Sequence, residues 1–323
     1  SIYLESFILA DDEVTHYFFE SLKRKAQEGI RVKIISDLLG SFTIGATHHE
    51  AFKKAGIEVL SFNRWFYRNH RKTLIIDEEI AFLGGVNIKG EYAHWLDLHI
   101  RIEGGLVHSI LRSFARVYRL AGGKEKEVLA IEHEESKKTM KRLDRSKIWF
   151  ISHWPFKGKS ALRDYYTKQC NEAKESIVIV TPYFIPHRWL IRVLDHAIQR
   201  GVRVDIMMPI KTDLWISNVA NHVFAKELQD RMRFFFVPDM NHAKVLFVDN
   251  REGLIGSNNI DAQSFDFNLE ASIVFQEKIM VKDLARIIEI WKKNAVSLAR
   301  IEKERPWYYD LIAWFIKLMQ PIL

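Results

Sequence analysis

Cysteine is nearly absent from this chain, and its scarcity excludes two common ways of stabilising a fold. Cys170 is the single cysteine among 323 residues, so no disulfide bond can form within the chain. A zinc site of the usual kind is not expected either, because Cys170 stands alone and the adjacent His48 and His49 have no suitable third partner. Hydrophobic residues make up 48% of the sequence, which is enough for a sizeable core.

Long apolar runs are also lacking. No segment approaches the roughly 20 apolar residues that cross a bilayer, and no signal peptide is recognisable. The chain begins at Ser1, without an initiator methionine, in a strand-like stretch over residues 2–9. The sequence therefore leaves room for an upstream segment that this chain does not contain.

The excess of positive charge is small. Lys and Arg number 48 and Asp and Glu 41, which gives a net charge of +7. Such an excess suits an anionic partner, either nucleic acid or an anionic membrane surface, and does not choose between them.

The chain contains an internal repeat. In each copy a His-x-Lys triplet is followed by Asp seven, Gly fourteen and Asn seventeen residues after the His. The copies lie 172 positions apart (242 minus 70), and four matching spacings are hard to obtain by chance. The repeated residues are His70, Lys72, Asp77, Gly84 and Asn87 in the first copy, and His242, Lys244, Asp249, Gly256 and Asn259 in the second.

The flanks of the motif repeat at the same offset and indicate the fold. Residues 29–35 match 201–207, and the short apolar runs 73–76 and 245–248 follow the two motifs in the manner of buried strands. Strands that alternate with helices predict an α/β protein. We expect two similar α/β/α halves related by a pseudo-twofold axis, each with a largely parallel mixed sheet.

Composition suggests the boundaries of these halves. We expect the first half over residues 1–121, a charged linker over 122–147, the second half over 148–304 and an aromatic amphipathic segment over 305–323. The last segment is too short to span a bilayer. It is expected either to lie in the membrane interface or to pack on the core or on a second subunit, so a homodimer stays open. A single helix is expected over 281–304.

Two histidines and two lysines at one site suit chemistry on a phosphate. Either motif alone would more often be structural, and the duplication favours catalysis. The lysines and asparagines would surround the phosphate with charge and donors. One neutral His would attack phosphorus and the other, protonated, would donate to the leaving oxygen, which fits an ordinary pKa of about 6.5. A phosphohistidine splits one hard displacement into two easier ones, and no metal or other cofactor is needed.

The paired motifs resemble the phospholipase D superfamily, and further stretches resemble the bacterial cardiolipin synthases. The resemblance covers nearly the whole chain. The stretches that carry it are Arg68-Asn69-His70-Arg71-Lys72, Gly84-Gly85-Val86-Asn87, Thr181-Pro182-Tyr183-Phe184-Ile185-Pro186, and Gly256-Ser257-Asn258-Asn259-Ile260-Asp261 through Ser264-Phe265 to Asn268-Leu269-Glu270.

The resemblance implies roles for particular residues. Its catalytic set is His70, Lys72, Asp77, His242, Lys244 and Asp249. The family also carries a carboxylate that orients a motif histidine, which Glu270 matches in the second copy and Asp97, one residue out of register, in the first. Such a partner is expected to raise the pKa of its histidine. Whether Asp97 serves His70, or the pairs cross between the halves, is left open.

The supporting residues are expected to be Asn87, Asn259 and Ser257, which would bind the substrate phosphate or hold the site together. By the same resemblance, His70 is the nucleophile and His242 the acid. Two departures bear on substrate specificity: Gly85 stands where the second copy has Ser257, and Gln263 stands where the family often has Arg.

The resemblance implies phosphatidyl transfer between phosphatidylglycerol molecules, with glycerol released, at the bacterial cytoplasmic membrane. The chain would be peripheral there or anchored by the upstream segment, with anionic phospholipid and the membrane surface as partners. Hydrolysis of phospholipid is the closely related outcome. A nuclease of the same superfamily is less favoured, because the aromatic C-terminus and the Tyr183-Phe184 turn fit lipid better than nucleic acid. A non-catalytic membrane-binding protein is disfavoured because both motifs are complete.

Overall fold

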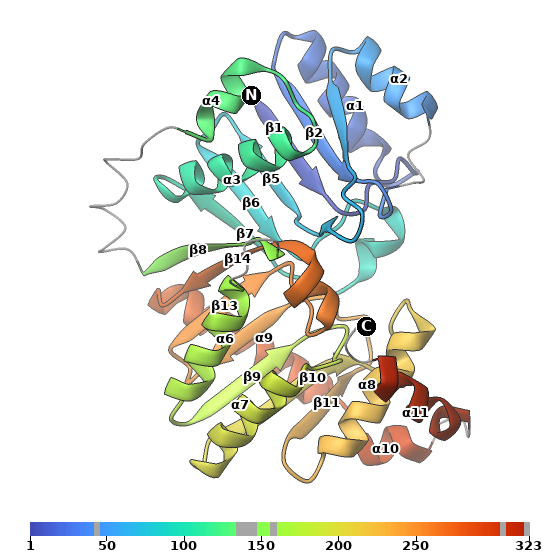
Figure 1. The fold of residues 1–323 in the computed structure, drawn as a ribbon, viewed down its shortest axis with the longest axis vertical. Coiled ribbons are helices and arrows are strands. Elements are labelled where there is room, and N and C mark those ends of the chain that lie inside the picture. The colour runs from blue at the N-terminus through green and yellow to red at the C-terminus, as the bar shows by residue number, and fades with distance from the viewer. Residues whose placement is uncertain (42–45, 134–146, 156–159, 304–307, 320–323) are drawn as a thin grey trace.

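The computed structural model describes residues 1–41, 46–133, 147–155, 160–303 and 308–319. The chain forms two α/β halves, one above the other in Figure 1, that meet along the middle of the molecule. The first half contains β1 (Ile2–Ser6), α1 (His16–Gln27), β2 (Val32–Asp37), α2 (Ala46–Lys54), β3 (Glu58–Phe62), β4 (Arg68–Asn69), β5 (Thr73–Ile76), β6 (Ile80–Gly84), η1 (Gly90–His94), β7 (His99–Glu103) and α3 (Leu106–Leu120).

The second half repeats this order after α4 (Lys126–Ile131) and an added strand, β8. Its elements are β8 (Ile148–His153), α6 (Ala161–Glu172), β9 (Ser176–Val180), α7 (Arg188–Gln199), β10 (Arg203–Pro209), α8 (Trp215–Leu228), β11 (Arg233–Val237), β12 (Val245–Val248), β13 (Glu252–Gly256), η3 (Gln263–Phe267), β14 (Asn268–Phe275), α9 (Lys278–Asn294), α10 (Leu298–Lys303) and α11 (Tyr308–Met319).

The two sheets have the same topology. The first runs β3-β2-β1-β5-β6-β7, and the second contains β11-β10-β9-β12-β13-β14. In each, the first three strands are parallel and the remaining three join them antiparallel. The expected α/β fold of two similar halves with mixed sheets is therefore confirmed.

Helices cover both faces of each sheet and so bury the strands on both sides. In β1, Leu4 faces a cluster that includes Phe19 of α1 and Phe52 of α2, whereas Tyr3 faces Phe114 of α3. The second sheet is likewise covered by α6, α7 and α8 on one face and by α9 on the other. Each half is thus an α/β/α layer structure.

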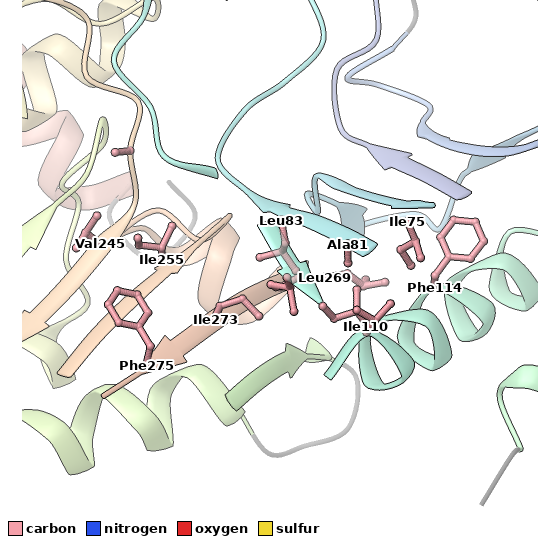
Figure 2. Close-up of a cluster of buried hydrophobic side chains, with 14 of the residues drawn as sticks. Ile75, Ala81, Leu83, Ile110, Phe114, Val245, Ile255, Leu269, Ile273 and Phe275 are labelled. Carbon is pink, nitrogen blue, oxygen red and sulfur yellow. The ribbon is translucent and has the colours of Figure 1, made fainter. Parts of the chain in front are cut away.

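One apolar cluster continues from the first half into the second. Figure 2 shows it as a row of side chains that extends from Phe114 and Ile75 to Val245 and Phe275, with Leu83 and Leu269 next to each other near its middle. The backbone also crosses the boundary, because β4 adds to the second sheet as a parallel neighbour of β14. The halves therefore share one interior.

One predicted helix needs correction. The helix expected over residues 281–304 is two helices, α9 and α10, because the chain bends out at Val296 to pair with Phe236 in an isolated bridge. The start of the predicted linker is helical, and Val128 and Ile131 of α4 are buried against the core. Most of the rest of that linker, 134–146, lies outside the described residues, as do 305–307 and 320–323 of the aromatic segment.

The described part of the aromatic segment is α11, which packs against α8. Its Ile316 is buried, whereas Trp314 and Phe315 are exposed to solvent. No helix in the described ranges is long and apolar enough to cross a membrane.

Candidate active site

Each motif histidine is held at the boundary between the halves by backbone hydrogen bonds to the other half. The N–H of His70 donates to the carbonyl of Leu269 at 3.1 Å, and the N–H of His242 donates to the carbonyl of Leu96 at 2.7 Å. Leu269 and Leu96 directly precede Glu270 and Asp97. The carboxylate-bearing segment of one half is therefore paired with the histidine-bearing segment of the other.

This pairing makes the carboxylate–histidine pairs cross between the halves. Nδ1 of His70 lies 3.0 Å from Oε1 of Glu270, and Nδ1 of His242 lies 2.8 Å from Oδ2 of Asp97. The sequence left two pairings open, and the structure selects the crossed one. Neither half alone contains a complete pair.

Asp97 and Glu270 occupy equivalent positions despite their mismatch in sequence. Gly84 pairs with His99 and Gly256 with Ser272, so each carboxylate stands two residues before a matched strand position. The connection before β14 contains the π-helical turn η3, whereas the matching connection contains the tighter 3₁₀ turn η1. A π-turn holds one more residue than the usual helical turn, which accounts for the shift by one.

Both motif lysines are buried in the same site. Nζ of Lys72 donates to the carbonyl of His70 at 2.6 Å, and Nζ of Lys244 donates to the carbonyl of His242. Burial lowers the pKa of Lys244 to about 8 and that of Lys72 well below its ordinary value. Each lysine also interacts electrostatically with the histidine of the other half. The site is therefore buried and shared between the halves, and an anionic ligand would favour the charged form of both lysines.

Burial disfavours the protonated form of both histidines. Burial lowers the pKa of His242 to about 3, helped by Lys244 and opposed by Asp97, and burial also lowers the pKa of His70. Each carboxylate does raise the pKa of its histidine, as expected, but burial and the lysines outweigh that contribution, so the net shift of the histidine pKa is downward. A neutral ring that donates from Nδ1 to a carboxylate keeps a free lone pair on Nε2, which is the state a nucleophile needs.

The predicted supporting residues are also buried at this boundary. Oδ1 of Asn87 accepts from the N–H of Ile8 at 3.3 Å, which leaves the Asn87 amide N–H groups for another acceptor. The side chain of Asn259 hydrogen-bonds Asp261, and its Oδ1 has no hydrogen-bond partner among the residues that the structure describes. The hydroxyl of Ser257 donates to Glu270, so this residue supports the carboxylate.

The structure does not bring Asp77 and Asp249 to the histidines. Both have positive φ, 51° and 54°, at the turns that follow β5 and β12. Seven residues of largely extended chain, at about 3.3 Å each, carry them to the far end of the strand. Asp249 there accepts hydrogen bonds from the backbone N–H groups of Lys174, Glu175 and Ser176. The expected catalytic role of Asp77 and Asp249 is therefore corrected: both aspartates have a structural role at the turns.

We expect Asp249→Ala to destabilise the fold without changing the chemistry. Losing the acceptor for three backbone N–H groups should cost about 1–2 kcal/mol of unfolding free energy, as for a helix cap. Turnover per folded molecule should stay within about twofold of wild type. Urea unfolding and active-site titration check both; a loss of turnover at unchanged stability would restore the aspartate to the catalytic set.

Two aromatic residues of the site were not predicted. The Phe7 ring lies edge-on to His70, with centroids 4.8 Å apart, and 5.2 Å from Nζ of Lys72. Trp95 lies 5.4 Å from the ring of His242. Trp95 adjoins Leu96-Asp97 in sequence, which is a usable signal, whereas nothing near Phe7 distinguishes it from a core residue. Each ring therefore packs against the histidine of one motif.

The fold and this site define a phospholipase D-like enzyme. A similar solved structure is phosphatidylserine synthase from Haemophilus influenzae Rd KW20, with a TM-score of 0.74 and 16% identity over all of this chain and 90% of that one. At that identity the comparison shows the fold alone. Polyphosphate kinase from Porphyromonas gingivalis has the same kind of fold, with a TM-score of 0.58 and 15% identity over 90% of this chain and 45% of that one.

The family follows from sequence. Residues 1–113 and 166–291 match the family model described as "Cardiolipin synthase, PLD-like domain". The chain is 31% identical to a cardiolipin synthase from Listeria welshimeri and 28% identical to one from Halalkalibacterium halodurans, over all of this chain and 70% and 67% of theirs. The chain belongs to the cardiolipin synthase family of phospholipase D-like enzymes.

Proposed function

We propose that the chain transfers a phosphatidyl group from one phosphatidylglycerol to the free glycerol hydroxyl of another, which yields cardiolipin and glycerol. The observation that carries the proposal is the pair of crossed carboxylate–histidine contacts beside two buried lysines. A nucleophile and a proton carrier on opposite sides of one phosphorus suit a two-step, in-line transfer.

In the first step, Nε2 of His70 attacks phosphorus. The bond from phosphorus to the glycerol oxygen breaks, and His242 gives that oxygen a proton, so glycerol leaves and a phosphatidyl-histidine remains. In the second step, neutral His242 takes the proton of the acceptor hydroxyl, which attacks the same phosphorus and releases His70. Each step leaves His242 in the protonation state that the next one needs.

A bound phosphate prepares His242 for its role as an acid. Burial and the two lysines favour the neutral form of His242. An anionic phosphodiester between them offsets their charge and raises the pKa of both histidines and lysines. Lys72, Lys244, Asn87 and Asn259 then stabilise the charge that builds up on the equatorial oxygens, so no metal ion is required.

The surface near the site supports lipid as the substrate. Trp65 and Phe66 are 88% and 72% exposed on the turn that leads into β4 and His70. Leu39 is exposed just beyond Asp37, whose carboxylate accepts from the N–H of Asn69. Aromatic side chains of this kind favour the membrane interface, and the net charge of +7 favours an anionic one.

The test is incubation with labelled phosphatidylglycerol in mixed micelles, with product analysis. Cardiolipin and glycerol in equal amounts, with turnover that survives a chelator, are expected. Phosphatidic acid alone would show a hydrolase, cleavage of labelled single-stranded DNA a nuclease, and no product an inactive protein. Co-sedimentation with phosphatidylglycerol vesicles, and much less with neutral phosphatidylcholine vesicles, is expected for the membrane partner. Activity that a chelator abolishes and one metal restores would overturn the metal-independent step.

A further inference from the structure

Arg71 lies between two catalytic residues but faces away from them. Its neighbours His70 and Lys72 turn into the site, and the alternation of an extended chain sends the Arg71 side chain to the opposite side. That side chain is 1% exposed, which is rare for arginine and requires partners for its charge.

The partners of Arg71 join the histidine segment to the strand beside Glu270. One guanidinium nitrogen donates to Oγ of Ser113 on α3 at 2.7 Å, and another donates to Oγ of Ser152 on β8 at 2.8 Å. The second nitrogen also lies 3.4 Å from the carbonyl of His153. The guanidinium stacks 4.3 Å from the ring centroid of Trp154.

Strand β8 transmits this contact to the carboxylate. It pairs antiparallel with β14, and His153 and Ser152 stand opposite Glu270 and Ala271. Glu270 is therefore held along its strand by β8, which Arg71 clamps to the segment that carries His70. The same carboxylate accepts from the hydroxyl of Ser257, so it is supported on two sides.

The other histidine has no such support in the described part of the chain. The position of Arg71 is taken by Ala243 in the second motif, and Glu5, which lies 4.0 Å from Arg71, is matched by Val180. Strand β7, which follows Asp97, is the end strand of its sheet in the described topology. The Asp97 carboxylate does accept from the N–H of Leu98 at 2.7 Å, so the asymmetry is the arginine clamp itself, which among the described residues only the His70–Glu270 pair has.

The asymmetry is not explained by stability. A buried ion pair rarely stabilises a fold more than apolar residues of similar volume, because both charges must be desolvated. The second half shows that an alanine and a valine satisfy the same fold at these positions. What arginine adds is a rigid planar fork that fixes several acceptors at once.

We propose that Arg71 is a positioning residue that fixes the His70–Glu270 pair, and so sets His70 apart from His242 as the nucleophile. The assignment of His70 as nucleophile rests on the proposed function; the positioning itself does not. A nucleophile must meet phosphorus along one direction in both steps, whereas a proton carrier serves two different oxygens and gains from freedom to adjust.

The test compares Glu5→Gln/Arg71→Met with wild type. The double change removes both buried charges and keeps similar volume, so no unpaired charge is left. Arg116→Met is the matched control, because Arg116 stacks on the same Trp154 ring at 4.1 Å but makes no described contact with Ser152 or His153. Imidazole ¹H–¹⁵N spectra of labelled histidines report on both pairs, and His242 serves as an internal control.

The double variant is expected to shift the His70 signals, leave those of His242 in place and lower kcat about 10- to 100-fold with little change in KM. Arg116→Met should leave the spectra of both histidines and kcat within about twofold of wild type. Unchanged His70 signals, or equal shifts of both histidines, would overturn the proposal. A wild type without turnover on phosphatidylglycerol would refute the proposed function, and the spectra would still decide the positioning role.

Discussion

Brief incubation of His242→Ala with labelled phosphatidylglycerol is expected to leave a covalent phosphatidyl group on His70. Nε2 of His70 keeps its lone pair in this variant, because Glu270 still accepts from Nδ1. Departure of glycerol without its proton donor should be slowed about 10²- to 10⁴-fold, which is the usual contribution of general acid catalysis. The second step loses its base as well, so the adduct should accumulate. Mass spectrometry of the histidine-containing peptides measures it.

The companion variants make the assignment decisive. His70→Ala should form no adduct and no product, whereas His108→Ala, an exposed histidine on α3, should behave as wild type. Overall turnover cannot separate the two roles, because both motif variants should be inactive. An adduct found on His242, in wild type or in His70→Ala, would reverse the roles and leave the two-histidine mechanism standing.

The arrangement of each half could be predicted because its information is local and duplicated. The constant offset of 172 positions carries over to the observed register after each motif, in which Thr73 pairs with Leu83 and Val245 with Ile255. Burial on both faces makes the strands read as short apolar runs such as 73–76 and 245–248. A repeat with these properties is enough to specify two similar sheets.

The crossed pairs could not be predicted because they depend on how the halves meet. Asn69 pairs with Leu269 across the boundary, and Leu96 pairs with Asn241. The histidine and carboxylate of each pair are 200 and 145 residues apart in sequence, and no pattern in either segment indicates so distant a partner. The π-turn that shifts Glu270 by one residue is equally invisible in sequence. The protonation of the histidines follows from burial, which is a property of the assembled site.

The motif aspartates show where resemblance alone misleads. Asp77 and Asp249 keep a fixed spacing from the histidines, yet the spacing serves the hairpin, since both occupy a left-handed turn at its far end. Asp and Asn tolerate such turns better than most residues. A regular spacing therefore marks a shared fold element as readily as a shared chemical role.

Glu270→Gln is expected to lower kcat about 10³- to 10⁴-fold while the protein stays folded. The carboxylate holds His70 in the Nδ1–H form and stabilises the positive charge that the ring gains as it attacks phosphorus. A glutamine amide can instead donate to Nδ1, which places the proton on Nε2 and blocks attack. Replacing the carboxylate of a catalytic triad by an amide has an effect of this size for the same reason.

Ser257→Gly is the matched control for this variant, because glycine already occupies the equivalent position in the first half. A side chain at Gly85 would meet Oδ1 of Asp97 at 2.2 Å, so Asp97 acts without a hydroxyl beside it. Ser257→Gly removes one hydrogen bond to Glu270 and keeps the carboxylate, so kcat should fall less than about tenfold. Since Glu270 and His70 belong to different halves, a large loss in Glu270→Gln with a small loss in Ser257→Gly identifies the crossed pair as the catalytic unit. Equal small losses in both would show that His70 works without its carboxylate and that the crossed contact only holds the halves together.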